Sequence, residues 1–411
     1  MPEEAGDAFT FPKKRIGLLV GKLAGGGAER VVSRLSYALS DRYDVTVLIL
    51  RSERQDYPAA GKVIDLGTGM GSRSVHLRLI RAILRINKVI RRERLDVVIS
   101  FLFWPNLING LFNRSCPRAV SIRSFESMTK EKGLAARFRL ACKRKAYRRA
   151  DRVIVLAERQ KETLLREMNL SADHVSVLEN FFDAEEIRTQ SQEAPPSAVP
   201  DRFLTPMTSV SLGRLTKKKN LPRLLAVFAA VRKALPEARL LLVGDGPQRE
   251  ELEALCRRLG IRESVCFTGR LSNPFPVLAS VGLYVSFSEN EGFPNACVEA
   301  MILGLPVLHT DCPTGPAEIL LGDTAPPGMP DDVCFGEYGG LIPVEGSGKA
   351  EERRREAAAN AWIRLLTDRS LHDHYAESAI LRSRRYGKEE GVSRYAALIE
   401  EITDLSEGKS R

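Results

Sequence analysis

The stretch SENEGFPNACVEAMILG, residues 288–304, decides the fold of this chain. It continues an apolar run, LYVSFS, that is typical of a buried strand, and its Pro294 and Gly304 suit the start and the end of a helix. The pattern places Glu291 on the loop after the strand and Glu299 inside the helix. In an open parallel sheet, ligands bind in the crevice beyond the carboxyl ends of the strands. The two carboxylates therefore lie where they can bind the hydroxyl groups of a sugar.

Apolar runs alternate with amphipathic stretches along most of the chain, which is typical of β–α–β units. The predicted strands are IGLLV, DVTVLIL, DVVIS, AVSIR, RVIVL and VSVLEN in the first half, and SVSL, RLLLV, VCFTG, LYVSFS and PVLHT in the second. Each set predicts one doubly wound α/β domain. A chain of 411 residues is also too long for one ordinary core.

The segment 191–206 separates the two sets of strands. It holds four prolines and no apolar period, so we interpret it as an interdomain linker. We therefore expect an N-terminal domain over residues 1–190 and a C-terminal domain over residues 207–385. Residues 386–411 form a last helix, for which packing back on the N-terminal domain is one option.

Composition indicates a cytoplasmic protein. No apolar run approaches the roughly 20 residues of a membrane-spanning helix. The first residues, MPEEAGDAFTFPKKR, are acidic where a secretory signal needs basic residues and then an apolar stretch. The seven cysteines form no Cys-x-x-Cys pair, and their odd number predicts reduced thiols rather than disulfides or a zinc site.

The net charge of +10 belongs to the first half of the chain. Residues 1–195 hold 35 Lys and Arg against 23 Asp and Glu, whereas residues 196–411 hold 27 against 29. The densest basic stretch, ARFRLACKRKAYRRADR at 136–152, mixes eight Lys and Arg with apolar residues at spacings that a helix divides into two faces. Such a helix suits an anionic membrane surface, although a solvated helix face also explains it. Nucleic-acid binding is a third reading, and no nucleic-acid motif accompanies the charge.

Two loops suit a phosphate. The loop GKLAGGGAER joins a strand to a helix through Gly25, Gly26 and Gly27, where free amides and the positive helix end favour an anion, although tight turns also use glycine for geometry alone. It lacks the G-x-G-x-x-G spacing of dinucleotide sites. The loop SLGRLTKKKN carries Arg214 and Lys219, which can neutralise a pyrophosphate. If a nucleoside diphosphate leaves in the reaction, these cations stabilise it.

Metal and hydrolase chemistry find little support. No Asp-x-Asp pair occurs, and the five histidines are scattered apart from His372 and His374, which a helix turns to different sides. We therefore expect no metal at the site. His309 ends the strand PVLHT, where it either touches the crevice or serves as a core residue. The nucleophile elbow G-x-S-x-G is missing.

Six segments together resemble a known family. They are GGGAERVV, GRL followed by Lys219 and Asn220, VGDGP, FTGRL, EGFPNACVEAM and GLPVLHTDCPTGPAEIL. In this order they resemble the retaining, nucleotide-sugar-dependent glycosyltransferases of family 4, the group 1 glycosyltransferases. The resemblance extends over nearly the whole chain and is strongest over residues 209–320. It implies the GT-B fold, an α/β architecture in which two Rossmann-like doubly wound domains face a central cleft.

The resemblance also implies roles for individual residues. Arg214 and Lys219 would hold the donor diphosphate, Glu291 would contact the hydroxyls of the donor sugar, and Glu299 would bind the ribose. The further donor contacts are Gly25, Gly26 and Gly27 over the phosphates, Gly213 and Gly244 on neighbouring loops, Arg270 and Leu271 at the base, and Gly292, Phe293, Pro294 and Asn295 facing the sugar.

One position departs from the family pattern. Many relatives carry a histidine at the end of the strand that here reads AVSIR, and this chain has Arg123 there. An arginine cannot act as a base near neutral pH. We therefore expect Arg123 to have an electrostatic role toward donor or acceptor, or the acceptor to be of another type, and we count it among the catalytic candidates with Arg214, Lys219 and Glu291.

The resemblance implies transfer of a hexose or N-acetylhexosamine from a nucleotide sugar, preferably UDP-linked, to a saccharide or polyprenyl-linked saccharide acceptor in envelope polysaccharide or glycolipid synthesis. The leaving phosphate would take the acceptor proton, so neither cofactor nor metal is expected. The predicted location is cytoplasmic, peripheral on the inner face of the cytoplasmic membrane, with no nucleic acid as partner. The alternatives are an inactive GT-B nucleotide-binding scaffold and a GT-B nucleotide-sugar epimerase.

Overall fold

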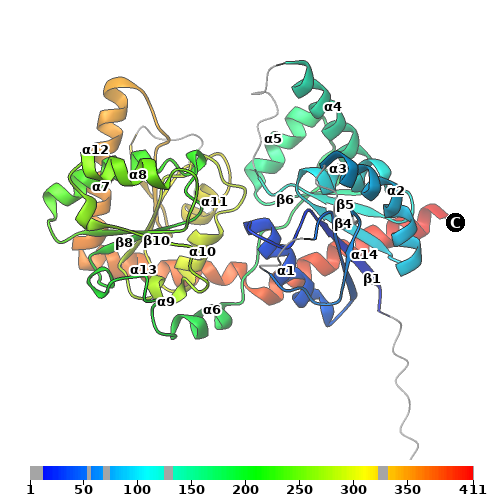
Figure 1. Ribbon diagram of the computed structural model, residues 1–411, viewed down its shortest axis with the longest axis horizontal. Helices are drawn as coiled ribbons and strands as arrows, with labels where there is room; N and C mark the ends of the chain where they lie inside the picture. The colour runs from blue at the N-terminus through cyan, green and yellow to red at the C-terminus, as the bar shows by residue number, and fades with distance from the viewer. Residues whose placement is uncertain (1–12, 53–56, 68–74, 125–132, 323–331, 411) are drawn as a thin grey trace, which may run out of the picture.

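The computed structural model describes residues 13–52, 57–67, 75–124, 133–322 and 332–410. Two α/β domains stand side by side in Figure 1, each built on its own sheet. The strand order is β3-β2-β1-β4-β5-β6-β7 in the N-terminal domain and β10-β9-β8-β11-β12-β14-β13 in the C-terminal domain. All described pairs are parallel except β13 with β14. The predicted fold class, two doubly wound Rossmann-like domains, is confirmed.

The N-terminal domain alternates strands with helices from the first strand onward. Its strands are β1 Arg15–Val20, β2 Asp44–Ile49, β3 Lys62–Asp65, β4 Val97–Phe101, β5 Arg118–Ser121, β6 Arg152–Val155 and β7 Val175–Val177. Its helices are α1 Gly27–Ser40, α2 Val75–Glu93, α3 Phe103–Phe112, α4 Leu134–Arg149 and α5 Glu158–Met168. Strand β3 was not predicted, because it is a short edge strand in which only Ile64 is buried.

The C-terminal domain repeats this plan. Its strands are β8 Thr208–Leu212, β9 Arg239–Val243, β10 Val265–Gly269, β11 Leu283–Ser286, β12 Val307–Thr310, β13 Cys334–Phe335 and β14 Gly340–Ile342. Its helices are α6 Ala184–Ser191, α7 Leu221–Ala234, α8 Arg249–Arg258, α9 Phe275–Leu278, α10 Asn295–Ile302, α11 Pro316–Leu320, α12 Gly348–Thr367 and α13 Arg369–Ser383. The predicted strands lacked β13 and β14, which are only two and three residues long.

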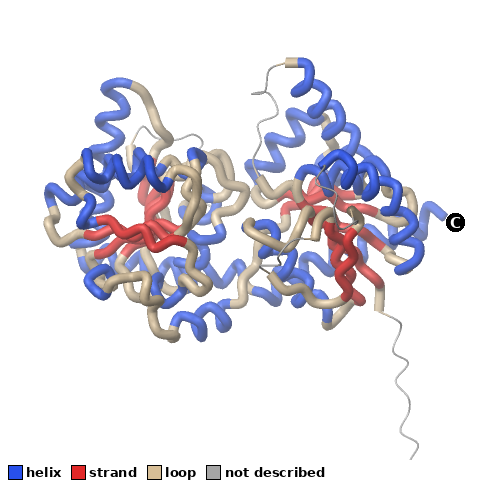
Figure 2. The backbone as a smooth tube through the Cα atoms, in the orientation of Figure 1, coloured by secondary structure: helices blue, strands red, loops and turns tan. Residues whose placement is uncertain are grey.

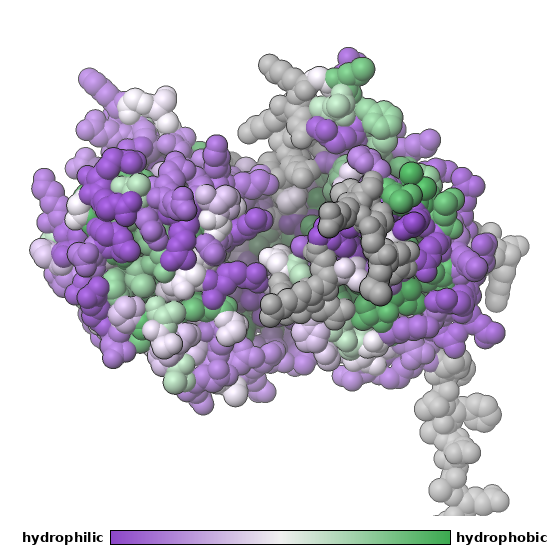
Figure 3. Space-filling view, in the orientation of Figure 1, coloured by the Kyte–Doolittle hydropathy of each residue, from purple (hydrophilic) through white to green (hydrophobic). Residues whose placement is uncertain are grey.

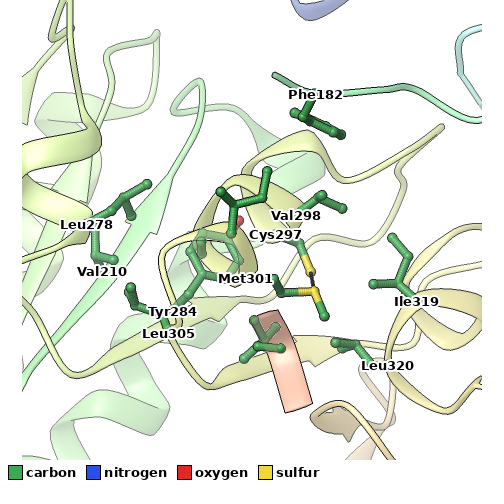
Figure 4. Close-up of a cluster of buried hydrophobic side chains, with 14 of the residues drawn as sticks. Phe182, Val210, Leu278, Tyr284, Cys297, Val298, Met301, Leu305, Ile319 and Leu320 are labelled. Atoms are coloured by element: carbon green, nitrogen blue, oxygen red, sulfur yellow. Dashed lines mark hydrogen bonds between the residues drawn. The ribbon is translucent and has the colours of Figure 1, made fainter. Parts of the chain in front are cut away.

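The helices cover both faces of each sheet, which leaves the strands at the centre of each domain (Figure 2). Such strands are buried on both faces and therefore read as continuous apolar runs. Strand β4, VVISF, is buried at every position, and so is β11, LYVS. In the C-terminal domain, α10 buries Cys297, Val298 and Met301 in the core (Figure 4). This packing fixes the helix that carries Glu299.

The chain passes between the domains twice, at two segments that lie side by side. The Phe182 amide donates to the Tyr386 carbonyl at 2.8 Å, and Phe182 forms a parallel bridge with Gly387. Segment 191–206, predicted as a linker, instead packs on the C-terminal domain, because Val199 and Phe203 are buried in its core. The first crossing therefore lies before α6, and the prolines shape a segment that wraps around the domain.

The last helix, α14 Lys388–Ser410, returns to the N-terminal domain (Figure 1). Its Tyr395, Ile399 and Ile402 are buried in the same apolar cluster as Val32 and Leu35 of α1. The N-terminal domain is thus completed by the end of the chain. No helix in the described ranges is long and apolar enough to cross a membrane.

Candidate active site

The loops that follow β1 and β11 meet between the domains, at the carboxyl ends of both sheets. The glycine turn after β1 borders the start of α10, because a Cβ on Gly27 would lie 3.6 Å from Nδ2 of Asn295. Arg30 of α1 forms an ion pair with Glu299 of α10. The crevice predicted beyond the strand ends is therefore shared by the two domains.

Glu291 lies on the loop after β11, as predicted, and is paired with Lys219. The Lys219 Nζ donates to Glu291 Oε1 at 2.5 Å, and the two side chains are 26% and 14% exposed. Burial raises the pKa of the Glu291 carboxyl, but the charge and hydrogen bond of Lys219, with smaller contributions from His309 and Ser288, together hold the pKa below its usual value. The Thr314 hydroxyl donates to the Glu291 carbonyl at 2.6 Å and holds the loop in place. Glu291 is therefore an ionised group at a fixed position.

His309 at the end of β12 is a buried neighbour of this pair. Its Nδ1 donates to the Thr310 carbonyl at 2.8 Å, and its Nε2 has no hydrogen-bond partner in the described part of the chain. Burial lowers the pKa of His309 to about 4, against the opposing effect of Glu291. The imidazole is therefore neutral at physiological pH, and its free nitrogen is an acceptor.

Glu299 lies inside α10, as predicted, but its side chain contacts the N-terminal domain. Its Oε1 accepts from Arg30, and Arg34 lies 3.4 Å from the same oxygen. The Glu299 side chain has no exposed surface, and its Oε2 has no hydrogen-bond partner among the described residues. Burial, followed by the like charge of Arg30, lowers the pKa of Arg34. Two cations thus share one carboxylate.

The glycine turn has the conformation that its sequence suggests. Gly25 has φ +84°, in the left-handed region that favours glycine, and Gly26 is the N-cap residue of α1. A Cβ on Gly26 would overlap the carboxylate of Glu29, which folds back over the helix start. Burial raises the pKa of Glu29. An anion at this turn must therefore displace the Glu29 side chain.

The loop after β8 carries the predicted diphosphate cations. Arg214 is exposed and forms no ion pair within the described ranges, whereas Lys219 ends a short 3₁₀ turn, Lys217–Lys219. Gly213 lies against the Lys219 stem, and a Cβ on Gly244 would overlap the Gly213 carbonyl oxygen. These two glycines thus serve the close approach of two loops.

The remaining predicted donor contacts take different places. Arg270 is exposed and Leu271 is half-buried, in the loop after β10. In the segment Gly292, Phe293, Pro294 and Asn295, the Asn295 amide already donates to the Phe293 carbonyl at 3.0 Å, so it does not face a ligand as expected. The amides of Gly292 and Phe293 have no acceptor among the described residues. The Phe293 ring is 7% exposed, because it packs between Phe182 and Tyr386.

Arg123 is engaged by protein groups rather than free in the crevice. Its Nη1 donates to Asn180 Oδ1 at 2.8 Å, its Nη2 donates to the Tyr395 hydroxyl at 3.1 Å, and its guanidinium lies 5.0 Å from the Phe101 ring centre. The Nδ2 of Asn180 donates in turn to Asn295 Oδ1 at 2.6 Å. A polar chain thus runs from α14 through Arg123 to the start of α10. This placement favours a positioning role.

Further polar contacts join the domains beside the crevice. Arg159 of α5 forms an ion pair with Asp311 at 3.1 Å, and the Glu318 carboxylate accepts from the Glu158 and Arg159 amides, both at 2.9 Å. Glu318 of the C-terminal domain therefore caps the start of a helix of the other domain. Within the described ranges, no group of three or more His, Cys, Asp or Glu side chains is placed to hold a metal ion.

Comparison with known proteins agrees with this geometry. The family profile described as Glycosyltransferase Family 4 matches residues 25–186, and the profile described as Glycosyl transferases group 1 matches residues 198–323. Together they span most of both domains. This chain belongs to the family 4, group 1 glycosyltransferases.

Curated relatives of this glycosyltransferase align along most of its length. The N-acetylgalactosamine-N,N'-diacetylbacillosaminyl-diphospho-undecaprenol 4-alpha-N-acetylgalactosaminyltransferase of Campylobacter jejuni is 24% identical, over 91% of this chain and 96% of its own. The amylovoran biosynthesis glycosyltransferase AmsD of Erwinia amylovora is 28% identical, over 72% and 81%. Among solved structures, the HepE protein of Anabaena in complex with UDP and glucose superposes with a TM-score of 0.73 at 19% identity, over 94% of this chain and 100% of that one.

Sequence reasoning missed Arg30 and Arg34 of the glycosyltransferase. They stand four residues apart on one face of α1, directly after the glycine turn. That spacing was visible, but it did not reveal which carboxylate faces them in the other domain. Asn180 was missed as well, because nothing in its local sequence indicates a contact with Asn295.

We predict that Glu291→Gln lowers the free energy of unfolding by about 1–3 kcal/mol at neutral pH, because it leaves the Lys219 ammonium without a counter-ion. A carboxyl whose folded-state pKa is lowered contributes stability that is present above its unfolded pKa and is lost as pH falls through its folded pKa. The difference from wild type should therefore shrink below about pH 4. Urea unfolding of both proteins between pH 3 and pH 7 measures this difference. A difference in unfolding free energy that stays constant with pH would contradict the lowered pKa of Glu291.

For Arg123, we predict that the alanine variant loosens α14. Loss of two hydrogen bonds from a charged donor should lower the free energy of unfolding by about 2–3 kcal/mol. Hydrogen exchange of 388–405 should accelerate, and Arg123→Lys should be intermediate. If exchange in α14 stays unchanged while turnover is abolished, Arg123 acts on the substrate and the positioning role is wrong.

Proposed function

We propose that this glycosyltransferase moves a hexose or N-acetylhexosamine from a UDP-sugar to an acceptor hydroxyl with retention of the anomeric configuration. The observation that carries the proposal is the meeting of Glu291, Lys219 and Glu299 at the strand ends with the glycine turn of the other domain. Carboxylates suit the hydroxyls of sugar and ribose, while a cation and free amides suit a diphosphate.

The chemistry of the site supports a retaining mechanism. Glu291 is ion-paired with Lys219, and the imidazole of His309 is buried and neutral. We propose that the acceptor oxygen bonds to the anomeric carbon on the face from which the phosphate oxygen leaves. The acceptor proton passes to that phosphate oxygen, so no side chain has to exchange a proton. The cations on the diphosphate stabilise the charge that grows as the bond breaks.

The donor and acceptor classes rest on the relatives. HepE, which shares the fold, was solved with UDP and glucose. The Campylobacter relative is named for a diphospho-undecaprenol substrate, and the Erwinia relative for amylovoran biosynthesis. We therefore propose a UDP-sugar donor and a saccharide or polyprenyl-linked saccharide acceptor in envelope polysaccharide or glycolipid synthesis, with neither metal nor cofactor.

A lipid-linked acceptor calls for contact with the membrane, and α4 suits this contact. Its Leu134 and Phe138 are 83% and 71% exposed. Apolar side chains stand among charged ones at the top of the N-terminal domain, around α4, in Figure 3. The basic residues along the same helix line a shallow hollow: Arg137, Arg144, Lys145, Arg148 and Arg149. Apolar anchors beside cations suit an anionic lipid surface, so we propose a peripheral location on the inner face of the cytoplasmic membrane.

We predict that UDP and UDP-sugars raise the melting temperature of the wild-type protein more than GDP, ADP and their sugars do. A ligand at 100 times its Kd adds about 2.7 kcal/mol. Excess EDTA should leave the shift unchanged, and Glu299→Ala should abolish it. When an acceptor that the enzyme glycosylates is supplied, proton NMR of the first product should show the anomeric configuration of the donor.

A product of inverted anomeric configuration would overturn the retaining mechanism but not the assignment as a glycosyltransferase. A shift abolished by EDTA would overturn the metal-free site. If no nucleotide changes the melting temperature, the proposed donor site is wrong, and a nucleotide shift without any turnover would favour the inactive nucleotide-binding scaffold.

We predict that the protein floats with vesicles containing anionic lipid and not with neutral vesicles, and that salt weakens the binding. The double variant Leu134→Ser, Phe138→Ser should bind at least about tenfold more weakly, because it removes two apolar anchors. Leu381→Ser is the matched control, since Leu381 is 58% exposed on the other domain. Equal flotation of all three proteins would contradict a role for α4.

A further inference from the structure

The pairing of Glu299 with two arginines presents a problem for donor binding. The carboxylate that would receive the ribose has no exposed surface, and its Oε1 is already held by Arg30 and Arg34. Its Oε2 is buried without a partner among the described residues. A nucleotide therefore cannot reach Glu299 while these contacts persist. Donor binding must rearrange the cluster.

The charges in the cluster limit how it can rearrange. Arg30 and Arg34 both pair with the single carboxylate of Glu299, and Glu186 adds a further negative charge near Arg34. Each arginine is only about a quarter exposed, at 27% and 25%. Arg34 is further fixed by the ring of Phe182, whose centre lies 5.5 Å from its guanidinium carbon. Removing the carboxylate from a largely buried arginine leaves an uncompensated charge, which is strongly unfavourable. An arginine that releases Glu299 therefore needs another anion.

Arg30 is the arginine placed to find one. It lies on the first turn of α1, three residues after Gly27, and the glycine turn borders Asn295 across the crevice. The same space is where the glycine turn would receive the donor phosphates. A guanidinium is also suited to phosphate, because its fork of donors matches two phosphate oxygens.

We propose that Arg30 exchanges partners when the donor binds. In the free enzyme its guanidinium pairs with Glu299, and in the donor complex the ribose hydroxyls take over Glu299 while Arg30 turns to the diphosphate. This inference rests on the proposed function, since it assigns to Arg30 a place in the same donor site. It makes Arg30 a specificity residue for the diphosphate, contributed by the domain opposite the nucleotide.

The exchange predicts that a nucleoside diphosphate binds better than the nucleoside alone. A nucleoside offers hydroxyls to Glu299 but no anion to Arg30, so its binding leaves the guanidinium unpaired. UDP supplies both partners at once. The exchange therefore favours UDP over uridine beyond what the cations of the C-terminal domain contribute by themselves.

The test compares the Kd of UDP with the Kd of uridine in the full-length protein, by calorimetry for UDP and by competition for uridine. In Arg30→Gln, UDP should bind about 10- to 100-fold more weakly, the range expected for loss of a charged hydrogen bond or two. Uridine should bind equally or more tightly, because Glu299 is less blocked. Arg30→Lys should keep part of the UDP affinity, since a lysine still offers a point charge.

Arg159→Gln is the matched control. It also removes an interdomain ion pair, with Asp311, but one that does not involve Glu299. Its effect on the two ligands should be equal, so the ratio of the two Kd values should stay at the wild-type level. Melting temperatures measured without ligand establish whether each variant is folded. If Arg30→Gln does not fold, the comparison is made with Arg30→Lys.

Two results would overturn the exchange. One is an unchanged UDP affinity in Arg30→Gln, and the other is an equal loss for UDP and uridine, which indicates only a structural role for Arg30. If the wild-type protein binds no uridine nucleotide, the proposed function fails and the exchange fails with it. This failure can be told apart from the other two results, because it is seen in the wild-type protein and they are seen only in the Arg30 variants.

Discussion

A buried carboxylate that finds its counter-charges only across the domain interface constrains the whole structure. A buried charge is unfavourable unless it is paired and hydrogen-bonded. Glu299 has no exposed surface, and the cations that reach it, Arg30 and Arg34, belong to the N-terminal domain. The C-terminal domain therefore cannot hide this group by itself. The same interaction therefore links the packing of the two domains to the proposed donor site.

The rest of the interface holds the domains without occupying that site. Arg159 pairs with Asp311, Glu318 caps α5, and the rings of Phe182, Phe293 and Tyr386 pack where the chain crosses twice. The interface thus combines fixed packing at the crossings with charges at the crevice that a ligand of the right chemistry can re-pair.

Local patterns predicted the parts of the site that depend on local structure. The loop position of Glu291 and the helical position of Glu299 follow from a strand, a proline and a capping glycine, and both predictions are confirmed. Contacts across the interface were not predictable, because periodicity shows which face of a helix is buried but not what covers it. The pairing of Arg30 with Glu299 was missed for this reason. The linker was misjudged because prolines mark irregular backbone, whether it is packed or free.

The protonation states of the crevice suggest how such a site can work without a general base. Lys219 keeps Glu291 ionised by lowering its pKa, and burial keeps His309 neutral with a pKa of about 4. Both groups are unprotonated near neutral pH, and their lowered pKa values make them weak bases toward the acceptor hydroxyl. What the described residues offer is fixed charge, and fixed charge stabilises a leaving diphosphate. This fixed charge supports the proposed mechanism, in which the leaving phosphate takes the acceptor proton.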